Sequence, residues 1–243
     1  RSFEDGPDRR RTGAPLSRSR HDRGLSTEIG HSNRVTGRKR RRLSRMRTQH
    51  DRARVSSTAE RNQIYGFTEI RRVTATLSLP TDIRDQACVL FESAQDADLL
   101  KGRSLEGFAA GAIYAVCRTN NVPRTIEEVT EVSRSAADEL RTAYAAMNRE
   151  LGLRTGPIDP TQYLPRYATQ LDIDPATESR ARTLIERATD SGAIGGRNPS
   201  GVAAAALYTA AKGHSDGPTQ AEAADIGGVT PVTLRAAHRV LAD

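Results

Sequence analysis

The chain has 243 residues, of which 37 are Lys or Arg and 30 are Asp or Glu, so its formal net charge is +7. The excess lies in residues 1–58, where 17 basic residues face 6 acidic ones, while the remaining 20 basic and 24 acidic residues give residues 59–243 a net charge of −4. A net acidic region is not a globally basic nucleic-acid binder. Any DNA contact within residues 59–243 must therefore be local.

The residue types exclude several functional classes. No apolar run reaches the roughly 18 to 20 residues that span a bilayer, and no signal peptide is recognisable, so we expect a soluble protein of the cytoplasm. Cys88 and Cys117 lack CxxC or His spacing, which predicts two buried thiols and no metal site. The His residues show no catalytic spacing, so we expect no enzyme; they are His21, His31, His50, His214 and His238.

The N-terminal part divides into two segments. Residues 1–33 are rich in Gly, Ser, Pro and Arg and show neither helical nor strand periodicity. Residues 34–58 form a basic linker, in which 34–54 can be a helix with Leu43, Met46 and His50 on one side. This charge run is compatible with a solvated linker, with a nuclear-import signal, or with an Arg-rich segment that orders on a nucleic-acid or acidic protein partner.

A small-residue sequence occurs twice. GRSLEGFAAGAIYAVCR at 102–118 and GRNPSGVAAAALYTAAK at 196–212 share their Gly, Arg and Tyr positions at an offset of 94 residues. The same offset pairs further residues over roughly 73–147 and 167–241, which indicates a duplication. We therefore predict two compact domains, at 59–152 and 158–243.

Each copy reads as five helices, because apolar residues recur at three and four positions and capping signals mark the starts. Ser57, Thr125 and Thr219 each precede a Glu by three residues, as in a capping box. The third helix of each copy is poor in bulky side chains, so we expect the other four to surround it. The predicted spans are 59–77, 82–98, 104–119, 125–132 and 135–149, then 160–171, 175–189, 199–212, 219–226 and 231–242.

The end of the second copy, TQAEAADIGGVTPVTLRAAHRVL at 219–241, has the pattern of a DNA-binding helix-turn-helix. Helical geometry places Leu234, Ala237 and Leu241 on one side of the last helix. A nearly opposite stripe should face outward and contact DNA together with the threonines that begin the helix; these candidates are Val232, Arg235, Arg239, Thr230 and Thr233. The same pattern also fits an ordinary pair of core-packing helices.

The first copy lacks this stripe. Ser133 and Arg134 stand where the second copy has two glycines, and Asp138 replaces the apolar Val232. We therefore expect only the second copy to read bases.

The chain resembles the archaeal transcription factor B family, the counterpart of eukaryotic TFIIB, and looks haloarchaeal. The resemblance rests on GAPLSRSRHDRGLSTEIG at 13–30, the two small-residue helices, and GGVTPVTLR at 227–235. It implies an all-α fold of two tandem five-helix cyclin-like domains preceded by an extended basic reader and linker. It also implies a general initiation factor that binds the TATA-box-binding protein on promoter DNA as a monomer and recruits RNA polymerase for start-site selection.

The resemblance also assigns roles to residues. Val232 and Arg235 match the family's reader of the element upstream of the TATA box. The polymerase and template reader loop would contain Arg9, Arg10, Arg11, His21 and Asp22. The family's zinc ribbon is missing from this chain, so we expect no cofactor here, and we expect two CxxC-like pairs in the sequence preceding Arg1.

Two other functions remain open. A cyclin-type regulatory subunit would use similar helical domains to bind a protein partner, but it would not need the basic N-terminal segment or an outward Arg stripe. A stand-alone helix-turn-helix regulator would keep the stripe and dimerise on a palindrome. Dependence of DNA binding on the TATA-box-binding protein distinguishes them.

Overall fold

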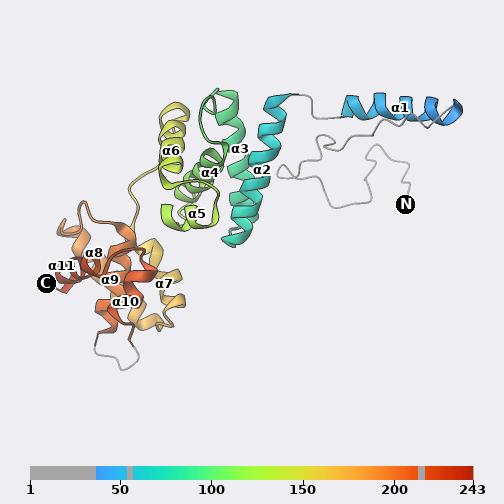
Figure 1. The fold of residues 1–243 in the computed structure, drawn as a ribbon. Coiled ribbons are helices and arrows are strands. Elements are labelled where there is room, and N and C mark those ends of the chain that lie inside the picture. The colour runs from blue at the N-terminus through green and yellow to red at the C-terminus, as the bar shows by residue number, and fades with distance from the viewer. Residues whose placement is uncertain (1–36, 54–56, 213–216, 243) are drawn as a thin grey trace, which may run out of the picture. The chain divides into compact units, whose positions relative to one another are not determined.

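The structure is a computed structural model that describes residues 37–53, 57–212 and 217–242. Within these ranges all regular elements are helices, and no strand occurs. Figure 1 shows the helices in two groups, preceded by one helix near the N-terminus. The predicted all-α fold with two tandem domains is confirmed.

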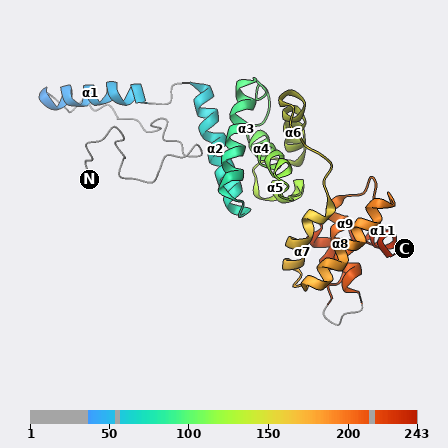
Figure 2. The same ribbon diagram turned by 180° about the vertical axis from the view of Figure 1, so that it is seen from behind.

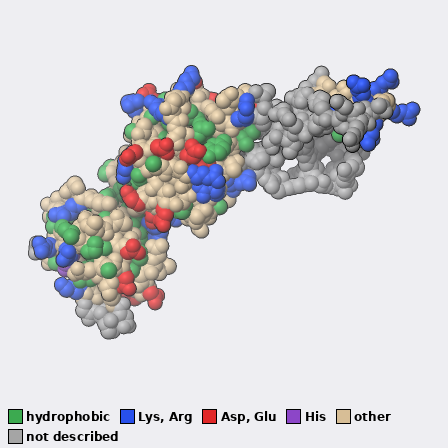
Figure 3. All heavy atoms as spheres, in the orientation of Figure 1, with side chains coloured by type: hydrophobic (Ala, Val, Ile, Leu, Met, Phe, Trp, Pro, Cys, Tyr) green, Lys and Arg blue, Asp and Glu red, His purple; other side chains and the backbone are tan. Residues whose placement is uncertain are grey.

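Helix α1 (Gly37–Ala53) lies in the basic linker, where the sequence allows a helix. Leu43 is half-buried and Met46, one turn later, is 44% exposed, so the apolar side of this helix is thin. Figure 3 shows basic side chains projecting along α1.

The first unit is built on α2 (Thr58–Thr76), α3 (Thr81–Asp96), α4 (Leu105–Thr119) and α6 (Ala137–Leu151), and the short helix α5 (Ile126–Val132) lies between α4 and α6 in the chain. Helices α2 and α3 pack side by side, as Figure 1 and Figure 2 show. Phe67 of α2 meets Phe91 of α3 edge-to-face, with ring centroids 6.3 Å apart. Both rings are buried, so this aromatic pair belongs to the core.

The second unit consists of the 3₁₀ turn η1 (Pro160–Tyr163), α7 (Leu164–Gln170), α8 (Pro175–Asp190), α9 (Pro199–Ala211), α10 (Gln220–Ile226) and α11 (Pro231–Ala242). Every other element of this unit contacts α9. Residues 200–207 on α9 are all buried. The predicted central position of this small-residue helix is therefore confirmed.

Small residues in the two central helices permit close approach. A Cβ atom on Gly111 would lie 3.1 Å from the Cβ of Ala143 on α6, and one on Gly201 would lie 3.0 Å from Val229 Cγ1. Larger side chains at these positions would push the packed elements apart. Composition thus explains why α4 can lie against α6, and why the turn after α10 can lie against α9.

The predicted caps are present. Oγ of Ser57 accepts from the Glu60 amide at 3.0 Å, and Thr125 Oγ1 accepts from the Glu128 amide at 3.1 Å. Before proline-started helices, Asp174 Oδ1 accepts from the Ala176 amide at 2.9 Å and Asn198 Oδ1 accepts from the Ser200 amide at 3.0 Å. These bonds satisfy amides that a helix leaves without partners, which fixes the helix starts.

The chain forms two compact units, and the boundary between them falls within the first repeat. They assign Cys117–Glu131, with most of α5, to the same compact unit as Leu153–Asp243. Arg166 of α7 makes a two-bonded ion pair with Glu128, and Asn121 accepts from Gln162 at 3.2 Å. These bonds tie residues 117–131 to the second unit.

Candidate nucleic-acid interface

The turn between α10 and α11 is made by two glycines with different tasks. Gly228 has a φ of +59°, a left-handed conformation that glycine adopts without a Cβ penalty. A Cβ on Gly227 would lie 2.9 Å from the Cβ of Ala204, so this position is limited by its approach to α9. The Val229 amide then donates to the Ala224 carbonyl at 3.0 Å. The turn that sets the angle between α10 and α11 is thus fixed locally.

Helix α10 begins in a reciprocal cap. Thr219 Oγ1 accepts from the Glu222 amide at 3.2 Å, while the Glu222 carboxylate accepts from the Thr219 amide at 2.8 Å. Hydrogen bonds from the Thr219 amide and hydroxyl lower the pKa of Glu222. The carboxylate therefore stays ionised at the N-terminus of α10, where the helix dipole favours negative charge.

Helix α11 has one buried and one exposed side, as its sequence predicts. Leu234, Ala237 and Leu241 are buried against the rest of the unit. Val232 is 66% exposed, and Arg235 and Arg239 are exposed as well. The side of α11 opposite its buried residues therefore presents one apolar side chain and two guanidinium groups to the solvent.

The threonines at the start of α11 hold its first turn. Thr230 Oγ1 accepts from the Thr233 amide at 3.3 Å, and the two hydroxyl oxygens lie 2.9 Å apart. Both threonines are exposed. Arg235 Nε donates to the Pro231 carbonyl at 3.2 Å, so its side chain lies back along its own helix. No acidic partner holds this guanidinium among the residues that the structure describes.

A buried hydrogen-bond chain links α7 to the turn. Ser200 Oγ donates to the Gly227 carbonyl at 2.5 Å, so the Tyr167 hydroxyl, 2.8 Å away, donates to Ser200. Burial raises the pKa of Tyr167, which keeps its proton available for this bond. Tyr167 and Ser200 thus fix the position of Gly227.

His238 belongs to the attachment of α11 and not to the exposed stripe. Its Nδ1 lies 2.8 Å from Thr209 Oγ1 of α9, and its ring meets the Tyr208 ring edge-to-face with centroids 5.2 Å apart. Thr209 Oγ1 already donates to the Ala205 carbonyl at 2.6 Å, so it accepts from Nδ1. Burial, followed by the charge of Lys212, lowers the pKa of His238. His238 is half-buried.

The matching part of the first unit is arranged differently. Arg141, the counterpart of Arg235, forms an ion pair with Asp138 at 3.2 Å. The Arg134 amide, at the position of Gly228, donates to Glu69 at 3.2 Å, and Glu69 is only 3% exposed. Bonds to Arg72 lower the pKa of Glu69 and offset the opposing effect of its burial. In the first unit, Asp138 thus occupies the position of Val232, and its carboxylate holds the guanidinium of Arg141.

Some of the other predicted site residues lie outside the part of the chain that the structure describes. Arg9, Arg10, Arg11, His21 and Asp22 lie outside the described residues. In the described part of the chain, no group of three or more His, Cys, Asp or Glu is placed to hold a metal ion. Cys88 and Cys117 are buried, as predicted, and burial raises the pKa of Cys117 to about 12. None of the helices described combines the length and apolar character needed to cross a bilayer.

Comparison with known proteins identifies the family. The family model described as the transcription factor TFIIB repeat matches residues 59–150 and again residues 153–243. The chain belongs to the TFIIB family. Transcription initiation factor IIB 1 of Halobacterium salinarum is similar at 58% identity over all of this chain and 85% of the relative. Initiation factor IIB 5 of the same organism is 45% identical over 97% of this chain and 78% of the relative.

A relative of lower sequence identity supports the same family. Transcription initiation factor IIB of Methanococcus aeolicus is 41% identical over 97% of this TFIIB-family chain and 72% of its own length. The resemblance to archaeal transcription factor B inferred from the sequence is therefore confirmed. This TFIIB-family chain is a general transcription initiation factor with two cyclin-like domains, and not an enzyme.

Proposed function

We propose that this initiation factor uses α11 to read promoter bases upstream of the TATA box, in a complex with the TATA-box-binding protein. The observation that carries the proposal is the stripe of Val232, Arg235 and Arg239, which is exposed on the side of α11 opposite its buried residues. A guanidinium offers two parallel donors that match O6 and N7 of guanine, and a Val side chain can contact a thymine methyl group. The threonines Thr230 and Thr233 stand at the helix end that enters the groove first.

The first unit serves another purpose in this proposal. Asp138 puts a negative charge where the second unit presents Val232, and Arg141 is paired with that acid. Phosphates repel such an acid, so the first unit is poorly suited to base reading. The two cyclin-like domains therefore grip the protein–DNA complex asymmetrically, and one of them supplies the sequence discrimination.

The basic N-terminal part acts on RNA polymerase in the same proposal. Residues 1–33 form the reader, whose Arg9, Arg10, Arg11, His21 and Asp22 lie near template DNA, and residues 34–58 form the linker. The charge division supports this, because the basic excess lies outside the two cyclin-like domains. Residues 1–58 thus contribute to polymerase recruitment and start-site selection, while residues 59–243 assemble on the promoter.

A mobility-shift assay tests the proposal. The full chain is titrated onto a promoter fragment that carries a TATA box and an upstream element, with and without TATA-box-binding protein at fixed salt. We expect a shift by this chain only when the TATA-box-binding protein is present. A stand-alone helix-turn-helix regulator would shift a palindromic site by itself, and a cyclin-type regulatory subunit would shift neither DNA.

A further inference from the structure

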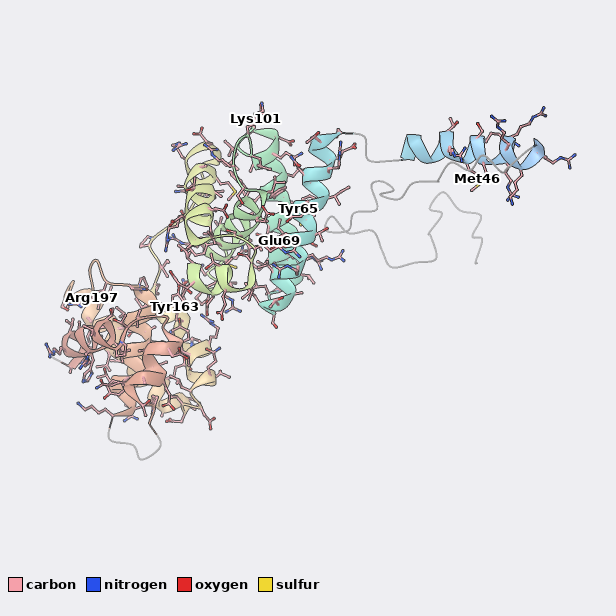
Figure 4. The ribbon with its side chains drawn as sticks, viewed as in Figure 1. Met46, Tyr65, Glu69, Lys101, Tyr163 and Arg197 are labelled. Atoms are coloured by element: carbon pink, nitrogen blue, oxygen red, sulfur yellow. The ribbon has the colours of Figure 1, made fainter. Side chains whose placement is uncertain are left out.

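A groove on the second unit has no role in the DNA contacts described above. It has a volume of about 710 Å³ and lies between residues 157–161 and the C-terminal half of α8. Its apolar lining comprises Ile158, Ile185, Ile194 and Val202 together with three prolines, and Ile185 and Val202 are each 1% exposed. Arg197, which is labelled in Figure 4, is among the residues that line it. Such an apolar groove on a protein surface is a place where a partner can bind.

The duplication shows what occupies this place in the first unit. The offset of 94 residues carries the bounds of α3 (Thr81–Asp96) onto those of α8 (Pro175–Asp190) without a shift. Helix α2, however, begins at Thr58, whereas the matching residues 152–159 are not helical and the chain becomes helical only at Pro160. The second unit therefore lacks the first two turns of its first helix.

Those two turns cover α3 in the first unit. Gln63 Nε2 donates to Glu92 Oε1 at 2.8 Å, and Gln95 Nε2 donates to the Ala59 carbonyl at 3.1 Å. Directly after these turns, a Cβ on Gly66 would lie 2.3 Å from the ring of Phe91, so the next turn of α2 rests on that ring; its counterpart in the second copy, Pro160, lines the groove. The first two turns of α2 are thus held against α3 by two hydrogen bonds, one to the carboxylate of Glu92 and one from Gln95 to a backbone carbonyl.

The corresponding residues of α8 line the open groove. Ile185 stands for Phe91 and Glu186 for Glu92, and Val202 of α9 replaces Phe108. The smaller Ile and Val leave space that two buried phenyl rings fill in the first unit. Glu186 is exposed, and no donor meets its carboxylate among the residues described. The groove thus offers an apolar surface and the Glu186 carboxylate at the place where the first unit carries the first turns of α2.

The charged residues that line the groove indicate which kind of helix it can bind. The lining contains three acidic residues, Asp159, Glu186 and Asp190, and one basic residue, Arg197. This acidic rim repels DNA phosphates and attracts a cationic side chain. We propose that the groove binds a short amphipathic helix of a partner protein, which places Lys or Arg against Glu186 and Asp190 and an apolar side chain over Ile185 and Ile194. This is helix-in-groove recognition, and it goes beyond the contacts with promoter DNA.

A peptide probe tests the proposal on the full chain. The probe is a fluorescein-labelled peptide of residues 57–68 with Gln63→Arg and a side-chain staple, because isolated helices of this length are marginal in water. Its matched control carries Gln63→Glu. We expect fluorescence anisotropy to show binding of the Arg probe at least tenfold tighter than that of the Glu probe. Absence of binding by the Arg probe, or equal binding of both, would overturn the proposal.

Variants of the full chain locate the binding. Glu186→Lys should reverse the preference between the two probes, and Thr189→Trp should abolish binding by filling the mouth of the groove. Asp225→Lys, which changes an exposed acid of α10 outside the groove, should alter neither affinity. Retained assembly with TATA-box-binding protein and DNA shows that each variant is folded. Undiminished binding by folded Thr189→Trp would place the probe elsewhere and refute the assignment.

The chain's own basic helix is the competing occupant. A third probe of residues 37–53 carries the Arg-rich sequence of α1 with Leu43 and Met46. We expect it to bind more weakly than the Arg probe, because it lacks an apolar side as broad as that of α2. If this probe binds more tightly than the Arg probe, and if Glu186→Lys abolishes its binding, the occupant is a segment of this chain and the partner assignment is wrong.

Discussion

Replacing Arg235 by Ala separates base reading from every other role of α11. Arg235 is exposed, and its one bond within the described residues runs from Nε to the Pro231 carbonyl at 3.2 Å on the same helix. A surface side chain of this kind contributes within about 0.5 kcal/mol to stability. Loss of a two-bonded contact to guanine costs about 1–3 kcal/mol, which weakens binding by about fivefold to about 150-fold. The variant should therefore bind poorly while it melts like the parent.

The assay compares two DNAs at one salt concentration, both with TATA-box-binding protein. We expect the full loss on a promoter with the preferred upstream element and much less on one whose element is scrambled. Arg141→Ala is the matched control, because Arg141 occupies the same position in the first copy and is paired with Asp138. It should leave the ratio of the two affinities unchanged.

Two results would refute the reasoning. Equal weakening on both DNAs would make Arg235 a phosphate contact without sequence information. Unchanged affinity on both, together with a lowered melting temperature, would return α11 to the ordinary core-packing helix pair that the sequence also allows.

Four further predictions concern separate parts of the chain. Val232→Asp, which introduces the acid of the first copy, should lower promoter affinity at least tenfold in the mobility shift, yet leave the melting temperature equal or higher because an acid in the first turn suits the helix dipole. Gly227→Val should lower the free energy of unfolding in urea by about 1–3 kcal/mol, because the turn cannot approach Ala204. Since the fold lowers the pKa of His238, protonation opposes folding, so stability is lost as pH falls below the unfolded pKa of about 6.5; His238→Gln should flatten the difference in melting temperature between pH 7.5 and 5.5. Deletion of residues 1–58 should preserve the ternary complex and abolish transcription in vitro, and loss of the complex would contradict the proposed division of labour.

Local signals in the sequence predicted most of the fold. The capping boxes at Ser57, Thr125 and Thr219 satisfy backbone amides within three residues, so their geometry is set by short stretches of chain. The exposed side of α11 follows from helical periodicity alone, which is why Val232 and Arg235 stand where the sequence places them.

Other features depend on contacts that leave no periodic trace. The single helix predicted over 160–171 begins as a 3₁₀ turn, because Pro165 has no amide to donate to the Thr161 carbonyl, and the Leu164 amide bonds that carbonyl instead. The groove beside α8 depends on where the first helix of each copy begins, at Thr58 in one and at Pro160 in the other, and this difference leaves no periodic signal. The order of bonds from Tyr167 through Ser200 joins residues 33 and 27 positions apart, beyond any local pattern.

That hydrogen-bond chain means that the direction of α11 is set partly from outside it. Ser200 can donate to only one acceptor, so the Gly227 carbonyl is held in place before any DNA is present, and a phenylalanine at position 167 would leave Ser200 without its donor. Preorganisation of this kind spares the bound state an ordering cost. A substitution in α7 can therefore change the orientation of α11 while the exposed side chains of α11 remain the same.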